Sequence, residues 1–177
     1  MIGDSLSVQG PFHLNVWGGR NPGRAVELSR HRFGAAPTLR QHAKAEDAIA
    51  AARAPGGVAI CALEPDTAWW GRLLARPELK IAGALPDDAR ARPQAFLVTR
   101  EGSGPTGEDR TFWVTDSGWS DTKIVEAMGE AGLIADPLAA AGGLKLFALA
   151  GYVQAEDGRL TNAPGRLTGV IGAAPIF

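Results

Sequence analysis

The sequence contains a single cysteine, Cys61, so no disulfide can form within the chain. A reducing compartment fits such a chain, and we expect a cytoplasmic protein. Cys61 lies in a continuous apolar run, which favours a buried small side chain over a nucleophile. Basic residues are not in excess either. The formal net charge is −1, so the chain lacks the excess of basic residues typical of proteins that bind nucleic acids, and we expect no nucleic-acid partner.

Long hydrophobic runs are also missing from the sequence. No apolar stretch approaches the length that spans a bilayer. The first ten residues, MIGDSLSVQG, lack the basic region and apolar core of a signal peptide. We therefore expect no membrane association.

Motifs for cofactors, metals and covalent catalysis are absent as well. His13, His31 and His42 have no metal-ligand spacing, and no paired cysteines accompany them. None of the serines lies in a G-x-S-x-G context, so nothing favours a hydrolase triad. The sequence predicts neither a metal nor a cofactor, and hydrogen-bonded or solvated histidines are the expectation.

What the chain does have is the composition of a globular protein. It has 177 residues, 45% of them hydrophobic and 21% charged, enough for one domain or two small ones. The pattern of elements changes at Pro93–Val114, where a loop rich in glycine separates two apolar runs. We take this stretch as a boundary. The predicted units are residues 1–10, residues 11–92 and residues 93–177.

Residues 12–86 alternate strand and helix signals. An N-cap at Asn21 with Pro22 in the first helical position predicts one helix start, and Asp66 predicts another. The expected strands are Phe12–Trp17, Thr38–His42, Val58–Leu63 and Leu79–Leu85, and the expected helices are Pro22–Phe33, Ala45–Arg53 and Thr67–Ala75. This order predicts an open, mainly parallel α/β sheet.

The second unit follows a different order, strand, helix, strand, strand and a return strand. Ser120 is the expected N-cap of its helix, which presents Ile124, Met128 and Ala131 on one buried face. The expected strands are Ala95–Thr99, Thr111–Thr115, Ile134–Leu138, Leu144–Val153 and Val170–Phe177. Such an order is typical of a ferredoxin-like α+β unit.

Two groups of residues are candidates for recognition. The loop Gly18, Gly19, Arg20 and Asn21 follows a strand and opens a helix, so its free N–H groups could hold a carboxylate or phosphate. A plain turn between strand and helix is the alternative. Trp69 and Trp70 could form a recognition surface, but their helical spacing with two leucines favours the core for at least one of them.

The chain resembles the prephenate dehydratases at several places. Gln94–Val98 and Pro105–Thr111 resemble the strand carrying that family's Thr-Arg-Phe motif and its Gly-Lys-Asp-Lys-Thr-like lead into an ACT domain. Val170–Pro175 is similar to the family's closing Leu-Gly-Ser-Tyr-Pro, and Leu79–Gly83 resembles the strand leading out of its first lobe. The resemblance implies a single periplasmic-binding-protein-like α/β lobe followed by an ACT-like domain.

The resemblance also implies binding residues. Glu64 stands where that family has the Glu of a Glu-Asn-Ser motif, and Gly118, Trp119 and Ser120 replace the Gly-Ala-Leu effector loop. A small aromatic or carboxylate metabolite is the implied ligand. Gln94-Ala95-Phe96 stands in place of the catalytic Thr-Arg-Phe, and residues 86–93 leave no room for a second lobe. Both differences imply that dehydration of prephenate is lost.

Residues 2–9 resemble the end of the last helix in the all-helical chorismate mutases. Ser5 and Gln9 have the spacing of that family's catalytic Ser and Gln, one helical turn apart. This implies the C-terminal regulatory or scaffolding region of a chorismate mutase, with the other mutase helices upstream and no catalysis by this chain alone. A dehydratase-like enzyme, or a structural module that has lost its ligand, is the alternative. Pairing through the ACT-like sheet implies a homodimer.

Overall fold

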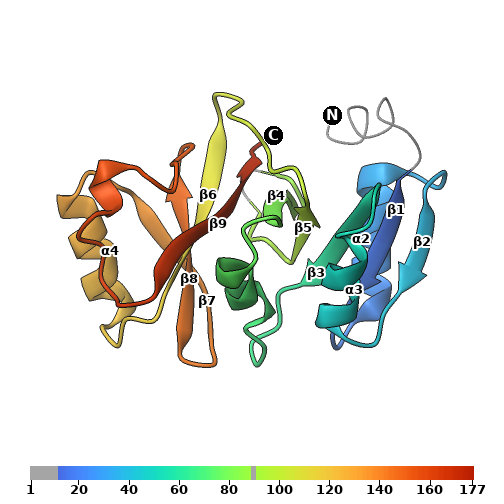
Figure 1. Cartoon of the computed structure of the whole chain (residues 1–177), viewed down its shortest axis with the longest axis horizontal. Helices are drawn as coiled ribbons and strands as arrows, with labels where there is room; N and C mark the ends of the chain where they lie inside the picture. Colours follow the sequence, from blue (N-terminus) through green and yellow to red (C-terminus); the bar gives the residue numbers. More distant parts are fainter. Residues whose placement is uncertain (1–11, 89–90) are drawn as a thin grey trace.

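A computed structural model of the chain describes residues 12–88 and 91–177, so Ser5 and Gln9 lie outside the described residues. Its nine strands form one sheet in the order β2-β1-β3-β5-β4-β9-β6-β8-β7 (Figure 1). The strands are β1 (His13–Trp17), β2 (Thr38–Gln41), β3 (Gly57–Ala62), β4 (Lys80–Leu85), β5 (Ala95–Thr99), β6 (Asp109–Thr115), β7 (Ala135–Ala141), β8 (Leu144–Ala150) and β9 (Thr168–Pro175). The helical elements are α2 (Pro22–Phe33), α3 (Ala45–Ala51), α4 (Asp121–Glu130) and the 3-10 segments η1 (Trp69–Ala75) and η2 (Gly158–Leu160).

The first half of the sheet contains β1 to β5. β1 pairs in parallel with β2 and β3, as the alternating strand and helix pattern predicts. β5 then inserts antiparallel between β3 and β4. The sequence assigned this strand to the second unit, but both of its partners belong to the first half. All five of its residues are buried, so it completes the core of the α/β half.

The predicted helix starts differ in their outcome. The Asn21 side chain accepts a hydrogen bond from the Arg24 N–H, and Pro22 begins α2 as predicted. The expected helix Thr67–Ala75 with an Asp66 cap is wrong. The structure has the 3-10 segment η1 from Trp69, with Ala68 at its N-cap. Gly71 lies so close to Leu144 of β8 that a Cβ would sit 2.3 Å from the leucine Cδ1, so tertiary packing governs this segment.

The second half contains β6 to β9 in the order β9-β6-β8-β7. α4 connects β6 to β7, and β8 lies between them, antiparallel to both. This is the split β-α-β arrangement expected of a ferredoxin-like unit. The Ser120 side chain accepts from the Lys123 N–H at the start of α4, which confirms the predicted cap. The connection from β8 to β9 carries only the short η2 segment.

The two halves meet where β4 pairs in parallel with β9, through the single register pair Ile81 and Gly172. Gly172 has φ +146°, and a Cβ there would lie 2.2 Å from the Ile81 carbonyl oxygen. Only glycine allows the two backbones to approach this closely. The structure is therefore one continuous mixed sheet, while a division of the chain near residue 92 into two domains stays a prediction.

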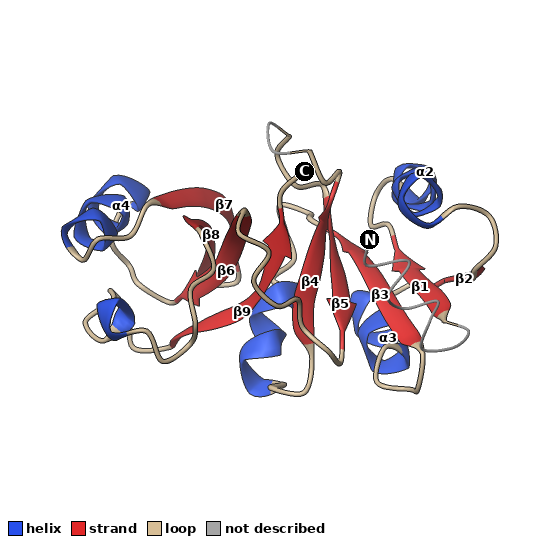
Figure 2. Ribbon diagram, turned by 90° about the horizontal axis from the view of Figure 1, so that it is seen from above, coloured by secondary structure: helices blue, strands red, loops and turns tan. Residues whose placement is uncertain are grey.

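Helices cover both faces of this sheet. α3 and η1 lie on one face, over a cluster that includes Trp70, Phe96 and Phe112 (Figure 2). On the other face α2 covers the first half and α4 covers the second. Phe96 of β5 and Phe112 of β6 have ring centroids 4.5 Å apart, so the core beneath α3 and η1 is shared by both halves.

Candidate functional site

The loop before α2 and Glu64 come together at the carboxyl ends of β1 and β3. The Arg20 backbone N–H donates to Glu64 Oε1 at 2.8 Å, and the Arg20 guanidinium pairs with Asp66. Gly19 has φ +59°, and a Cβ on it would lie 2.1 Å from Glu64 Oε1. Two candidates that the sequence named separately thus share one location.

This contact changes what the loop can do for a ligand. The Arg20 N–H already has an acceptor in the largely buried Glu64 carboxylate, whose side chain is only 13% exposed. A ligand carboxylate at this N–H would therefore have to displace Glu64. Ligand binding by Gly18, Gly19, Arg20, Asn21 and Glu64 stays a prediction.

Gln94, at the position of the dehydratase Thr, lies beside the same loop. The Gln94 carbonyl accepts a hydrogen bond from the N–H of Leu63, the residue before Glu64. This bond holds the Gln94 backbone close to Glu64. The Gln94 side-chain oxygen accepts from Arg24 Nε at 3.0 Å. The first turn of α2 and the start of β5 are thus joined by a hydrogen bond from a guanidinium to an uncharged amide oxygen.

Gly118, Trp119 and Ser120 lie elsewhere, between β6 and α4. Lys145 Nζ donates to the Trp119 carbonyl at 2.6 Å and pairs with Asp121 at 2.9 Å. Lys123 Nζ stands 4.0 Å from the centre of the Trp119 ring. Four strands separate β6 from β1 in the sheet, so the structure does not bring this loop to the first group. Its role in binding stays a prediction.

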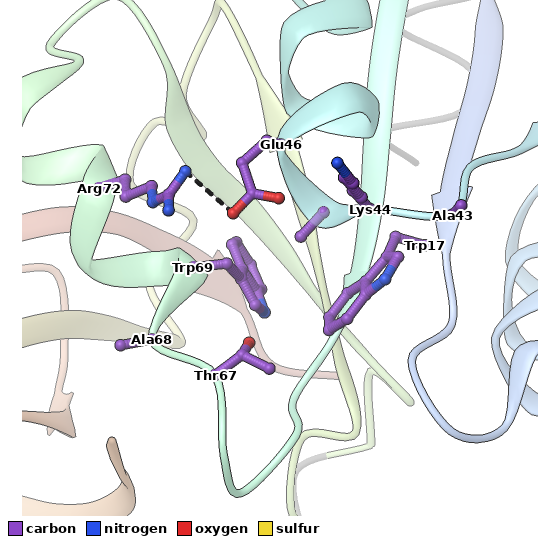
Figure 3. A pocket seen from close by; sticks show the side chains of 9 residues that line it. Trp17, Ala43, Lys44, Glu46, Thr67, Ala68, Trp69 and Arg72 are labelled. Carbon is purple, nitrogen blue, oxygen red and sulfur yellow. Dashed lines mark ion pairs between the residues drawn. The ribbon is translucent and has the colours of Figure 1, made fainter. Parts of the chain in front are cut away.

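A pocket of about 430 Å³ opens beside η1, near the same edge of the sheet. Trp17 ends β1, and Trp69 begins η1; Figure 3 shows their indole rings on either side of the opening. Lys44 and Arg72 contribute positive charge at its rim. The lining residues are Trp17, Ala43, Lys44, Ala45, Glu46, Thr67, Ala68, Trp69 and Arg72.

The polar groups of this pocket are unequally engaged. Arg72 Nη1 pairs with Glu46 Oε1 at 2.9 Å, and Trp69 Nε1 donates to the Ala62 carbonyl at 2.7 Å. Lys44 makes no ion pair or side-chain hydrogen bond with any described residue. The buried hydroxyl oxygen of Thr67 also lacks a partner among them. The pocket therefore combines the partly exposed Trp17 ring and one uncommitted cation with two buried groups in its wall, the Trp69 ring and the uncommitted Thr67 hydroxyl.

Sequence reasoning missed this pocket, apart from noticing Trp69. Its residues come from the end of β1, the start of α3 and the approach to and start of η1, and no short motif contains them. A general rule was available, because ligands in open α/β sheets bind outside the carboxyl ends of the parallel strands. Trp17 at the end of β1 satisfies that rule. Trp69 and Trp70 are both buried in the core, as predicted for at least one of them.

Several chemistries find no support in the described structure. Cys61 is buried, as predicted. Burial, with a smaller contribution from the charge of Glu46, raises the pKa of its thiol far above the ordinary value. Across residues 12–88 and 91–177, no group of three or more His, Cys, Asp or Glu side chains is arranged to hold a metal ion. None of the helices in that part of the chain is both long and apolar enough to cross a membrane.

The fold is similar to those of three solved proteins. A protein named GqqA, described as a novel type of quorum quenching acylase, matches with a TM-score of 0.61 at 15% identity, over 93% of this chain and 95% of that one. A prephenate dehydratase from Streptococcus mutans matches with a TM-score of 0.53 at 12% identity, over 93% and 99% of the chains.

A prephenate dehydratase from Arthrobacter aurescens, solved in complex with L-Phe, matches with a TM-score of 0.51 at 14% identity, over 92% of this chain and 90% of that one. No protein-family model and no curated protein sequence matches the chain. At these identities the likeness concerns the fold, and this chain has a prephenate dehydratase-like fold.

Proposed function

We propose that this chain is a prephenate dehydratase-like protein that binds a small cyclic or aromatic carboxylate between α3 and η1. The observation that carries the proposal is the pocket in which Trp17 and Trp69 flank an uncommitted Lys44. Indole faces bind flat rings, and an ammonium group binds a carboxylate through a charge-assisted hydrogen bond. The likeness of the fold to two prephenate dehydratases supports the same class of ligand.

Each pocket residue has a role in this proposal. The ring of the ligand packs on the partly exposed Trp17 indole, against the wall that contains Trp69, and Lys44 binds its carboxylate. If the Thr67 side chain turns toward the pocket, its hydroxyl donates to a second oxygen of the ligand, which gives a partner to a buried group that has none among the described residues. Arg72 is held by Glu46 and shapes the rim.

The pocket supports binding better than it supports catalysis. Dehydration needs a group that donates a proton to the leaving oxygen, and acyl transfer needs a nucleophile beside a base. The only carboxylate in the lining is paired with Arg72, and the only hydroxyl, that of Thr67, has no histidine beside it. The proposed activity is therefore ligand binding, with consumption of prephenate as the enzymatic alternative.

The chorismate mutase and ACT-like parts of the expected function have less structural support than the pocket. The chorismate mutase reading depends on Ser5 and Gln9, outside the described residues, and the similar solved structures lend it no support. A regulatory ACT-like role for the second half, and pairing of two chains through it, remain hypotheses that follow from the strand order β9-β6-β8-β7.

Tryptophan fluorescence, with calorimetry, tests the proposal. The purified chain is titrated with prephenate, chorismate, phenylpyruvate and L-phenylalanine. We expect at least one carboxylate to bind saturably. Trp17→Leu should reduce the affinity, and Lys44→Gln should reduce it about tenfold or more, because a charge-assisted hydrogen bond is lost.

Arg166→Gln is the matched control, since it removes one exposed positive charge from the second half of the chain. It should bind as the unaltered chain does. If none of the four compounds binds, or if Lys44→Gln and Arg166→Gln bind equally well, the proposal is wrong. Incubation of the unaltered chain with prephenate and with chorismate, followed by measurement of what remains, tests the enzymatic alternatives separately.

A further inference from the structure

A second pocket lies at the joint between the two halves, away from α3 and η1. Its volume is about 350 Å³. Lys80 of β4 and the loop Gly102–Ser103 line it from the first half, and the segment Tyr152–Glu156 lines it from the second. Val170 and Gly172 of β9 also line it, and Val170 packs against the α4 cluster. The pocket therefore lies on the face opposite η1.

Its walls are held in place by the protein itself. The buried Thr111 hydroxyl donates to the Gly151 carbonyl at 2.7 Å and accepts from the Val153 N–H at 2.8 Å. These bonds fix the backbone on both sides of Tyr152. Across the pocket, a Cβ on Gly102 would lie 3.3 Å from Lys80 Cβ, so this loop packs on the stem of the lysine. A pocket with fixed walls loses little entropy when it binds a ligand.

The charged groups of this pocket are uncommitted. Lys80 and Glu156 make no ion pair or side-chain hydrogen bond with any described residue, and neither does the Tyr152 hydroxyl. Elsewhere in this protein charged side chains form ion pairs, as Arg20 does with Asp66 and Lys145 does with Asp121. An unpaired cation and an unpaired carboxylate beside one aromatic ring match a ligand with complementary groups.

We propose that this pocket binds a small ring compound that carries a carboxylate and a hydrogen-bond donor. Lys80 binds the carboxylate, Glu156 accepts from the donor, and the Tyr152 ring packs against the ring of the ligand. Because the pocket takes walls from both halves, a bound ligand stabilises the joint at Ile81 and Gly172. This site is independent of the pocket proposed between α3 and η1.

Tyr152 gives a direct probe of this pocket, because it is the only tyrosine in the chain. Protein made with 3-fluorotyrosine should give one fluorine resonance from the pocket. No tryptophan lines this site, but Trp113 pairs with Val170 of its wall, so tryptophan fluorescence alone does not separate the two pockets. Lys44→Gln and Lys80→Gln separate them, because each removes a cation from one pocket only. The two proposals can therefore fail separately.

The probes are 4-hydroxybenzoate and 4-aminobenzoate, with benzoate lacking the donor and 4-hydroxybenzyl alcohol lacking the carboxylate. We expect the first two to shift the resonance saturably and to raise the melting temperature. Benzoate should bind more weakly, and the alcohol more weakly still. Lys80→Gln and Glu156→Gln should each weaken 4-hydroxybenzoate binding about tenfold.

Two controls separate recognition from general damage. Glu156→Gln should not weaken benzoate binding, because benzoate offers that side chain no donor and the variant removes a like charge from the pocket. Lys44→Gln should leave the response of the fluorine resonance to 4-hydroxybenzoate unchanged. The proposal is overturned if 4-hydroxybenzoate causes no saturable shift up to its solubility limit. It is equally overturned if Lys80→Gln binds 4-hydroxybenzoate as tightly as the unaltered chain does.

Discussion

The two halves of the sheet use glycine-rich loops and carboxylates differently. In the first half, strands run mainly in parallel, and the loop before α2 meets Glu64 at their carboxyl ends. In the second half, neighbouring strands alternate in direction. There the Asp116 carboxylate accepts hydrogen bonds from the N–H groups of Arg166 and Leu167, which hold the loop before β9 in place. Parallel strands gather their loops at one edge, so the first half forms the pocket with the two indoles.

The largest expected effect tests whether the halves are energetically separate. Phe96→Ala should lower the free energy of unfolding by about 3–5 kcal/mol, because it leaves a cavity in the shared core. Phe96 contacts Trp69 in the first half and Phe112 in the second. Hydrogen exchange should therefore report the same loss of stability in β3 and β8.

Phe33→Ala is the control, since this half-buried ring packs only at the edge of the first half, against Phe12. It should cost roughly half as much, in proportion to the apolar area it buries. Loss of protection in β3 but not in β8 after Phe96→Ala would mean that the halves unfold independently.

Gly172→Ala should have the next largest effect, about 2–3 kcal/mol, because a Cβ at this φ is strained and collides with the β4 backbone. Denaturant unfolding followed by circular dichroism measures the loss. Gly129→Ala in α4 is the matched control. A Cβ there meets nothing within 4 Å, and alanine favours the helix, so this variant should be slightly more stable. Equal stability of the two variants would contradict a close-packed joint.

Glu64→Ala tests the carboxylate of the first half. It should cost about 1–2 kcal/mol, because the Arg20 N–H loses its charged acceptor. Added acetate should restore part of the melting temperature by occupying the same N–H. The control Glu126→Ala removes an exposed carboxylate of α4 and should gain nothing from acetate. An equal response of the two variants would remove the loop as a carboxylate site.

The smallest expected effect concerns the connection between β8 and β9, which contains η2. Hydrogen bonds from the Arg159 side chain, and then from its backbone, lower the pKa of Asp157 from 3.8 to about 2. The folded state therefore gains stability that is fully present above the unfolded pKa and is lost as the pH falls from about 4 towards 2. Asp157→Asn should flatten the dependence of the melting temperature on pH in this range. An unchanged slope would contradict the prediction.

Local signals in the sequence predicted where helices and strands begin better than they predicted which strands pair in the sheet. Asn21 and Ser120 cap their helices as expected, because a cap depends only on residues three positions away. The position of β5 was not predictable from its own apolar pattern. A buried strand has the same apolar pattern wherever it lies in a sheet. The place of β5 between β3 and β4 depends on contacts with residues distant in the sequence.

The candidate site was predictable only in part, for the same reason. Gly19 and Glu64 were both singled out, yet nothing in the spacing of 45 residues indicated that they touch. Lys44 and Arg72 are ordinary surface charges when seen in the sequence. Their importance comes from lying beside Trp17 and Trp69 in one pocket, which depends on the packing of α3 and η1 on the sheet.

The position of β9 also bears on how the protein is made. Among the strands of the described residues β9 comes last in sequence, yet it lies between β4 and β6, in the interior of the sheet. A ribosome must therefore deliver the residues around Gly172 before the two groups of strands can join. Until then, β4 and β6 each expose an unpaired edge to other chains, and we expect chaperones to matter most during this interval.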